Sequence, residues 1–248
     1  MSSEDRDVAE QRRLLRSIGV LANLADAELD QLLPQTLWHR VSQGQEVLSH
    51  LTTSSQVYFL ITGVFRAQMT TAYGKTVAIR KLHAGAHIGE IAALTGAPRS
   101  VSVIAETDGL VAEWSPQMFK QAMQNNALFA EAIAASLARN VILLTDRLFE
   151  LAALEVRFRL YAELLRLAHH GETSSAGILV RDAPTHEMMA AAIGAQREAV
   201  TREISQLTAM NILEHKRREL LIKDLGQLQK MVQQRAGLTA TQVLDWQT

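Results

Sequence analysis

A change in hydrophobic periodicity at Pro116 constrains the fold of this chain more than any other feature. From Thr36 to about Ser115, short β-branched and aromatic runs alternate with glycine, as in residues 56–67, and this pattern predicts successive antiparallel hairpins. Many short strands at such spacing are typical of a small barrel or sandwich, in which glycines supply the positive φ angles of turns. After Pro116 the apolar residues recur at helical spacing. We therefore expect an α+β protein whose β domain precedes a helical region.

A heptad seam marks the helix that is expected after the β domain. Its members recur at intervals of four, three, four and three residues: Leu137, Val141, Leu144, Leu148 and Leu151. Such a seam is typical of a helix that pairs with a second copy of itself, although packing against the chain's own β domain produces the same pattern. We predict a dimerisation helix over about 127–156, with the homodimer contact at about 137–155.

Two domains are expected, with their boundary near residue 156. Residues 1–156 would hold the β domain and the dimerisation helix, and residues 157–248 a smaller αβ unit with an amphipathic helix near 224–236. Short helices are expected before the strands because apolar residues there recur at helical spacing. Asp26 is placed to cap one of these helices.

The composition excludes several classes of protein. The 248 residues contain no cysteine, which excludes disulfides, cysteine nucleophiles, thiolate zinc sites and cysteine-held iron–sulfur clusters and favours a reducing, cytoplasmic compartment. The acidic N-terminus lacks the pattern of a signal peptide, and no uninterrupted apolar stretch approaches the ~18 residues of a membrane span. The net charge of −1 argues against bulk coating of nucleic acid, but residues 157–248 carry 12 Lys and Arg against 10 Asp and Glu, so a local basic surface is expected there.

A glycine and a carboxylate lie ten and nine residues before an arginine, with a helical turn between them: Gly89, Glu90 and Arg99. In a pocket, Arg99 would pair with a phosphate, Glu90 would accept a bond from a ribose 2′-hydroxyl, and Gly89 would let the backbone approach closely. The amides of Ile91 and Ala92 would add donors for an anion. An ion pair between Glu90 and Arg99 that bridges two strands explains the same spacing, and the spacing alone does not decide between these alternatives.

The stretch 87–102 resembles the phosphate-binding cassette of cyclic-nucleotide-binding domains. The family pattern of Gly-Glu, Leu or Ile, Ala or Ser, a short helix and Pro-Arg before a small residue is met in full: Gly89, Glu90, Ile91, Ala92, Pro98, Arg99 and Ser100. The resemblance implies that Glu90 holds the ribose, Arg99 the cyclic phosphate, and Ser100 the phosphate or a guanine edge. It makes Thr145 of the long helix the first candidate that reads the base. Arg139 and Asn140, about one and a half turns earlier, could also reach a purine, but solvated positions on an amphipathic helix explain them equally well. It favours cyclic AMP as the regulatory ligand and leaves cyclic GMP open.

Residues 185–202 have the order helix, glycine-containing turn, helix, which is typical of a helix-turn-helix. Thr185 suits an N-cap, and Gly194 lies where the chain must reverse. On the second helix the apolar residues fall on one side, and a polar set falls on or beside the other: Arg197, Glu198, Thr201, Arg202 and Ser205. Arginine binds the O6 and N7 atoms of guanine and glutamate accepts from the amino group of cytosine. Exposed Arg and Glu are also ordinary surface residues, so the pattern indicates DNA recognition without proving it.

The run 197–202 resembles the recognition helix of the catabolite-activator and fumarate-nitrate-regulator family of bacterial transcription factors. That family joins a cyclic-nucleotide β-roll, a long dimer helix and a winged helix-turn-helix, and the resemblance covers about residues 20–223. It implies a homodimer that binds a pseudo-palindromic operator in double-stranded DNA, with RNA polymerase as a further candidate partner. The residues expected to contact DNA are Thr185, Gln196, Arg197, Glu198, Thr201, Arg202, Lys216 and Arg217, the last two in a basic wing that also includes Arg218. A solvated hairpin tip explains the same basic triplet.

Two residues depart from the family pattern. Met188 stands where glutamate is common, which removes the reciprocal capping partner of Thr185. Gln196 replaces the usual serine before Arg197, which weakens the N-cap of the recognition helix and brings a longer amide toward the DNA. We therefore expect a looser first turn and an operator that differs from the best-known one.

Other functions fit the sequence less well. A haem sensor would need an axial ligand such as His83 or His87, and the eight histidines are scattered. No nucleophile elbow, Walker loop or metal-ligand cluster occurs, so we do not expect an enzyme. The remaining alternative is a DNA-binding regulator of the same fold that needs no ligand or senses another effector. The sequence leaves open whether the protein activates or represses, and in which direction the ligand changes DNA affinity.

Overall fold

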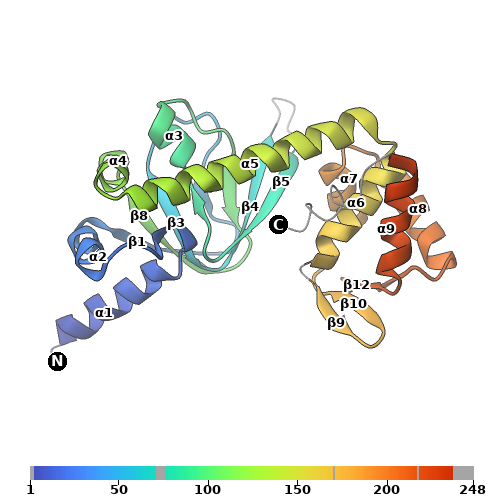
Figure 1. Ribbon diagram of the computed structural model, residues 1–248, viewed down its shortest axis with the longest axis horizontal. Helices are drawn as coiled ribbons and strands as arrows, with labels where there is room; N and C mark the ends of the chain where they lie inside the picture. The colour runs from blue at the N-terminus through green and yellow to red at the C-terminus, as the bar shows by residue number, and fades with distance from the viewer. Residues whose placement is uncertain (1–2, 71–75, 170, 217, 237–248) are drawn as a thin grey trace. The chain divides into compact units, whose positions relative to one another are not determined.

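The computed structural model describes residues 3–70, 76–169, 171–216 and 218–236 (Figure 1). It divides into two compact units, Met1–Arg139 and Asn140–Thr248. Both units share the long helix α5 (Ala127–Ala153), inside which the division falls. The boundary expected near residue 156 instead coincides with the end of α5 and the start of the next helix.

The N-terminal unit is an antiparallel β-roll built from two four-stranded sheets. The first sheet has the spatial order β1 (Leu37–Val41), β8 (Gly109–Trp114), β3 (Val57–Thr62) and β6 (His87–Ile88). The second has the order β2 (Glu46–Leu48), β7 (Ser102–Ala105), β4 (Val64–Thr70) and β5 (Thr76–His83). All neighbouring strands pair antiparallel, which confirms the predicted β-roll.

Aromatic side chains fill the core between the first sheet and the helices that pack on it. The rings of Phe59 and Trp114 meet edge to face with centroids 4.7 Å apart, and Trp114 Nε1 donates to Thr36 Oγ1 at 2.9 Å. The buried indole therefore keeps its hydrogen bond, as a polar group inside a core must. The other helices around the β-roll are α1 (Ser3–Arg16), α2 (Asp26–Leu32), α3 (Glu90–Thr95) and α4 (Pro116–Asn125), with short 3-10 helices at Gly19–Leu21 and Leu33–Gln35.

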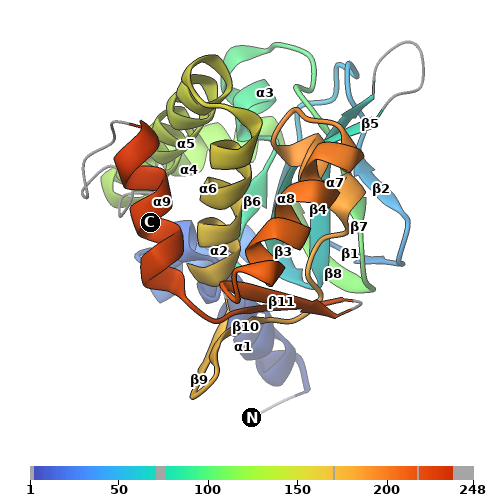
Figure 2. The same ribbon diagram turned by 90° about the vertical axis from the view of Figure 1, so that its right-hand side faces the viewer.

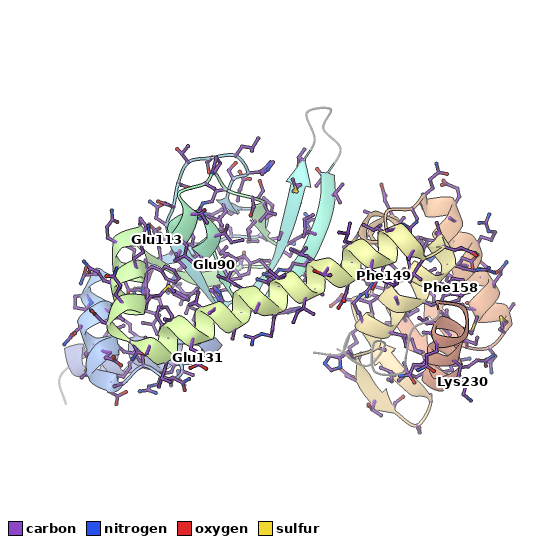
Figure 3. The ribbon with its side chains drawn as sticks, turned by 45° about the horizontal axis from the view of Figure 1, so that its top comes forward. Glu90, Glu113, Glu131, Phe149, Phe158 and Lys230 are labelled. Carbon is purple, nitrogen blue, oxygen red and sulfur yellow. The ribbon has the colours of Figure 1, made fainter. Side chains whose placement is uncertain are left out.

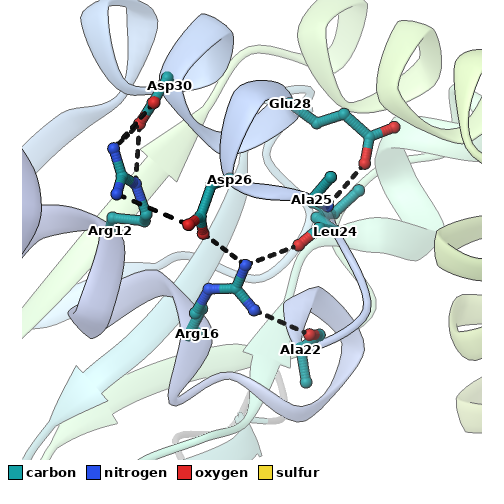
Figure 4. A network of polar contacts seen from close by, with 8 residues as sticks. All are labelled: Arg12, Arg16, Ala22, Leu24, Ala25, Asp26, Glu28 and Asp30. Carbon is teal, nitrogen blue, oxygen red and sulfur yellow. Dashed lines mark hydrogen bonds and ion pairs between the residues drawn. The ribbon is translucent and has the colours of Figure 1, made fainter.

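The N-terminal helices show that the predicted role of Asp26 is wrong (Figure 4). Helix α2 begins at Asp26 itself, and its N-cap is Ala25, whose amide donates to the Glu28 carboxylate at 2.7 Å. Asp26 pairs with Arg16 of α1 at 2.6 Å instead. The carboxylate therefore joins two helices, because a basic partner is within its reach and Glu28 already serves the helix end.

The C-terminal unit is a winged helix-turn-helix (Figure 2). Its elements after α5 are α6 (Val156–His169), β9 (Glu172–Ser174), β10 (Gly177–Val180), α7 (His186–Ala192), α8 (Arg197–Ala209), β11 (Leu213–Lys216), β12 (Glu219–Ile222) and α9 (Leu225–Ala236). The strands form one sheet in the order β11, β12, β10, β9. Helix α9 packs on α6 and buries Leu228 and Val232 completely, so the segment near 224–236 completes the core of this unit.

Ion pairs hold the second half of α5 to α6. Arg166 makes two bonds to the Glu150 carboxylate, at 2.6 and 3.1 Å, and Arg147 pairs with Glu163 at 2.9 Å. Glu150 is buried and Glu163 lies between the two arginines, whose charges hold the pKa of its carboxyl below the usual range despite burial. These pairs lie within the C-terminal unit, which begins at Asn140 inside α5.

Candidate functional site

The cassette turn requires glycine at position 89. Gly89 joins β6 to α3 in the left-handed region, with a φ of 92°. A Cβ atom added there would lie 2.5 Å from Arg99 Nη1 and 2.5 Å from the Gln56 carbonyl oxygen. The backbone conformation and the close approach of the guanidinium therefore both exclude a side chain.

Arg99 is held by the chain itself. Its Nε donates to Ser54 Oγ at 3.0 Å, Nη1 to the Gly89 carbonyl at 3.1 Å and Nη2 to the Gln56 carbonyl at 2.7 Å. Its amide also donates to the Thr52 carbonyl at 2.9 Å. The residue is only 2% exposed, and the three side-chain bonds leave two of the five guanidinium N–H groups for a ligand. Sequence reasoning missed Ser54 and Gln56, which no motif marks.

Glu90 is buried close to this arginine without bonding to it. It is 5% exposed, and burial raises the pKa of its carboxyl, against the opposing attraction of Arg80 and Arg99. Within the described residues no ion pair joins Glu90 to Arg99. The structural ion pair of the alternative interpretation is therefore not formed in this structure. Figure 3 labels Glu90 together with Glu113 in the β-roll.

The surroundings of the cassette carry further titratable side chains. Burial lowers the pKa of His87 to about 4, and the positive charges of Arg80 and Arg139 add to this effect. Burial raises the pKa of Tyr58, and the nearby Glu113 adds to the shift. His87 is therefore neutral at pH 7.

The remaining predicted ligand contacts lie in different environments. Ile91 and Ser100 are exposed, whereas Ala92 is buried. The amides of Ile91 and Ala92 open the short helix α3, as expected. Thr145 belongs to the other unit, where its hydroxyl donates to the Val141 carbonyl at 2.9 Å.

The second half of α5 exposes four of the five members of the heptad seam, Val141, Leu144, Leu148 and Leu151, whereas Leu137 is partly buried against the core of the N-terminal unit. The exposed large apolar side chains of this half of the helix are Val141 (63%), Ile142 (60%), Leu143 (40%), Leu144 (59%), Leu148 (68%), Phe149 (45%) and Leu151 (50%). By length and composition alone α5 is also apolar enough to cross a membrane. The same stretch, however, contains Arg147 and Glu150, which pair with α6 inside the C-terminal unit. The helix therefore carries charged side chains that are paired within the protein as well as an exposed apolar face.

The first helix of the helix-turn-helix is capped despite its departure from the family pattern. Thr185 Oγ1 accepts from the Met188 amide at 3.2 Å, so the cap survives without a glutamate at position 188. Gly194 takes the left-handed conformation in the turn, with a φ of 61°. Gln196 occupies the N-cap position of α8 and makes no side-chain cap bond, as its replacement of serine predicts.

Helix α8 has one buried and one exposed face. Val200, Ile204 and Leu207 are buried in the core of the C-terminal unit. The predicted DNA contacts on this helix are exposed and line one shallow surface pocket of about 350 Å³: Arg197, Glu198, Thr201 and Arg202. The helical spacing therefore placed these residues correctly, since the apolar stripe fixes which face remains free.

The hairpin of β11 and β12 forms the wing. Lys216 pairs with Glu214 of the same strand, and Arg218 lies 3.4 Å from Asp182. Both basic side chains are exposed at more than three quarters of their surface, so their charges remain available to a phosphate backbone. Arg217, the other predicted wing contact, lies outside the described residues.

Comparisons with known proteins agree with this geometry. One family model, "Cyclic nucleotide-binding domain", matches residues 38–126, and another, "Crp-like helix-turn-helix domain", matches residues 158–231. The cAMP-activated global transcriptional regulator CRP of Escherichia coli O6:H1 is 25% identical over 189 residues, which cover 76% of this chain and 90% of that protein.

Two solved structures share the fold. A CooA variant from Carboxydothermus hydrogenoformans aligns with a TM-score of 0.72 and 21% identity, over 82% of this chain and 90% of its own. The c-di-GMP responsive global regulator CLP of Xanthomonas campestris aligns with a TM-score of 0.68 and 19% identity, over 80% of this chain and 99% of its own. Together with the two family models, they show that the chain belongs to the CRP/FNR family of DNA-binding transcription regulators and carries a cyclic nucleotide-binding domain.

Proposed function

We propose that the protein is a cytoplasmic homodimeric regulator whose affinity for DNA responds to a cyclic nucleotide, with cyclic AMP favoured over cyclic GMP. The observation that carries the proposal is the cassette itself. Glu90 and Arg99 are both present and buried, and within the described residues no ion pair joins them, although the charge of Arg99 acts on the Glu90 carboxyl. A buried carboxylate and a buried guanidinium that do not bond to each other are suited to a ligand that carries a hydroxyl donor beside an anion.

The ligand contacts follow from the hydrogen-bond donors and acceptors that the cassette leaves available. The two remaining N–H groups of Arg99 and the amides of Ile91 and Ala92 would bind the cyclic phosphate. The Glu90 carboxylate would accept the ribose 2′-hydroxyl, and Ser100 would bind the phosphate or a guanine edge. Thr145 would read the base. Because one relative is cAMP-activated and another c-di-GMP responsive, the choice of nucleotide needs a direct measurement.

The test is calorimetric titration of the full chain with cyclic AMP and, separately, cyclic GMP. We expect saturable binding that disappears in Arg99→Ala, with Thr53→Ala in the neighbouring exposed loop as the control that keeps binding. If neither nucleotide gives a heat of binding, the proposal that the protein senses a nucleotide is rejected. That result would favour a family regulator that needs no ligand or senses another effector, for which haem is the weakest candidate.

A second copy of the chain is the partner that the exposed seam of α5 fits. Its apolar side chains recur at heptad spacing, and two identical seams bury each other in a parallel coiled coil. Light scattering should show a dimer for the native chain. Leu148→Glu should produce a monomer, whereas Leu128→Glu, at an exposed position of the same helix outside the seam, should remain dimeric. A dimeric Leu148→Glu protein would reject this interface.

The DNA contacts would come from the exposed face of α8. Arg197, Glu198 and Arg202 would reach base edges in the major groove, with Thr201 beside them, while Thr185, Gln196, Lys216 and Arg217 would contact phosphates or neighbouring bases. In a dimer the two α8 helices must lie about 34 Å apart to enter successive major grooves of a pseudo-palindromic operator. RNA polymerase is the partner that such a regulator would meet at a promoter.

A further inference from the structure

Two stacked histidines join the three elements that form the candidate DNA-binding face. His186 opens α7 and His215 lies in the wing strand β11, with ring centroids 5.0 Å apart and planes inclined by 29°. His186 Nδ1 also lies 2.9 Å from Thr201 Oγ1 of α8. One imidazole therefore contacts both the wing strand and the recognition helix. The sequence gives no signal for this arrangement, because the three residues are far apart along the chain.

The hydrogen bonds determine which nitrogen of His186 carries the proton. Thr201 Oγ1 has one proton, which it can donate to the Arg197 carbonyl 3.0 Å away; with the proton there, the oxygen accepts a bond from His186 Nδ1. His186 Nε2 is buried and has no hydrogen-bond partner among the residues that the structure describes. A proton on Nε2 would therefore be a buried donor without an acceptor, which costs free energy. Both observations assign a neutral ring with its proton on Nδ1.

The charges around the ring support the neutral form. Burial lowers the pKa of His186, and the two groups that face it, His215 of β11 and Arg197 of α8, act in the same direction. Glu187, the carboxylate that follows on α7, is exposed. A second proton on the ring would add a positive charge beside Arg197 and an unsatisfied N–H.

We infer that His186 is a positioning residue for DNA recognition, which fixes Thr201 on the outer face of α8 through its Nδ1–H bond. The hydroxyl proton of Thr201 is committed to Arg197 and one lone pair to His186. Thr201 can therefore offer DNA its methyl group and one lone pair, but no donor. Its base contact is restricted to a thymine methyl group or an amino group, and a guanine O6 or N7 acceptor is excluded. This inference rests on the proposed role of α8 as the recognition helix.

The test uses a pair of amide substitutions that mimic the two ring nitrogens. His186→Asn places an amide nitrogen near the position of Nδ1, and His186→Gln places it near that of Nε2. The full chain would first select duplexes from a random library, and the recovered duplex would serve as the probe in fluorescence anisotropy. We expect His186→Asn to stay within about 3-fold of the native affinity and to keep its base preference. His186→Gln should lose about 10-fold and relax the preference at one base pair of each half-site.

Each outcome decides a separate point. Equal binding by the Asn and Gln variants would overturn the inference, as would nitrogen-15 chemical shifts that place the proton of native His186 on Nε2. A merely structural role would lower the unfolding midpoint of both variants and leave the base preference unchanged. If Arg202→Ala fails to weaken binding, the assignment of α8 itself is wrong. If Arg202→Ala weakens binding while the His186 variants do not, only the positioning role is rejected.

Discussion

The two candidate binding sites of this protein hold their charged residues in opposite ways. In the cassette, Arg99 is 2% exposed and makes three side-chain bonds to its own chain. On α8, the Arg202 side chain is 68% exposed, and its nearest carboxylate contact is 4.0 Å away. A buried guanidinium is costly unless it is bonded, whereas an exposed one is hydrated at little cost. The cassette therefore holds its guanidinium in one orientation, and α8 leaves its guanidinium hydrated and free to move.

The difference predicts where stability and binding are coupled. A change in the cassette should affect both the fold of the N-terminal unit and ligand affinity, because the same bonds serve both. A change on the outer face of α8 should affect DNA affinity alone.

Arg99→Met should have the largest effect. It removes the charge-assisted bonds to a phosphate, so nucleotide affinity should fall by about 100-fold or more. It also leaves the Gly89 and Gln56 carbonyls and the Ser54 hydroxyl without their donor, so the free energy of unfolding should fall by about 2–4 kcal/mol. Calorimetry and urea unfolding would measure the two losses. A variant that loses affinity at native stability would show that the internal bonds contribute nothing to the fold.

Acidification should destabilise the N-terminal unit through His87. Because the pKa of His87 is lowered to about 4 in the folded protein, the unfolded chain takes up a proton first as pH falls. Stability should therefore decline from about pH 6.5 to about pH 4, by at most about 3 kcal/mol. Fluorescence of the buried Trp114 would follow unfolding. His87→Gln should flatten this part of the profile, while His83→Gln at an exposed position should leave it unchanged; identical profiles would contradict the assignment.

Arg202→Ala should weaken DNA binding by about 10- to 100-fold, as the loss of one base contact does. The free energy of unfolding should change by less than about 0.5 kcal/mol, because the side chain is exposed. Gln206→Ala, at an exposed position further along α8, serves as the control in anisotropy and urea unfolding. A large loss of stability in Arg202→Ala would contradict the prediction that a change on the outer face of α8 affects DNA affinity alone.

Ser54→Ala should have the smallest effect. The serine accepts only one of the bonds that orient Arg99, so nucleotide affinity should fall by about 3- to 10-fold. Thr53→Ala, in the same exposed loop, is the matched control for calorimetry. An unchanged affinity would show that the two carbonyl bonds suffice to hold the guanidinium.

The sequence predicted what depends on local pattern. The apolar stripe of α8 identified its free face, and the cassette motif identified the glycine that admits Arg99. The partners of Arg99 were not predictable, because Ser54 and Gln56 lie 45 and 43 residues away along the chain and reach it only through the strand register. The salt bridge of Asp26 was missed for the same reason. It depends on which charged side chains meet between helices, and periodicity does not encode this.

We propose that a ligand bound in the cassette changes the affinity of α8 for DNA. The most direct measurement is the dissociation constant of the full chain for a duplex that it selects, by fluorescence anisotropy with and without saturating cyclic AMP, and again with cyclic GMP. We expect that one nucleotide shifts this constant by at least about 5-fold, in either direction, and that Arg99→Ala abolishes the shift. Superimposable curves, at nucleotide concentrations that calorimetry shows to be saturating, would contradict it.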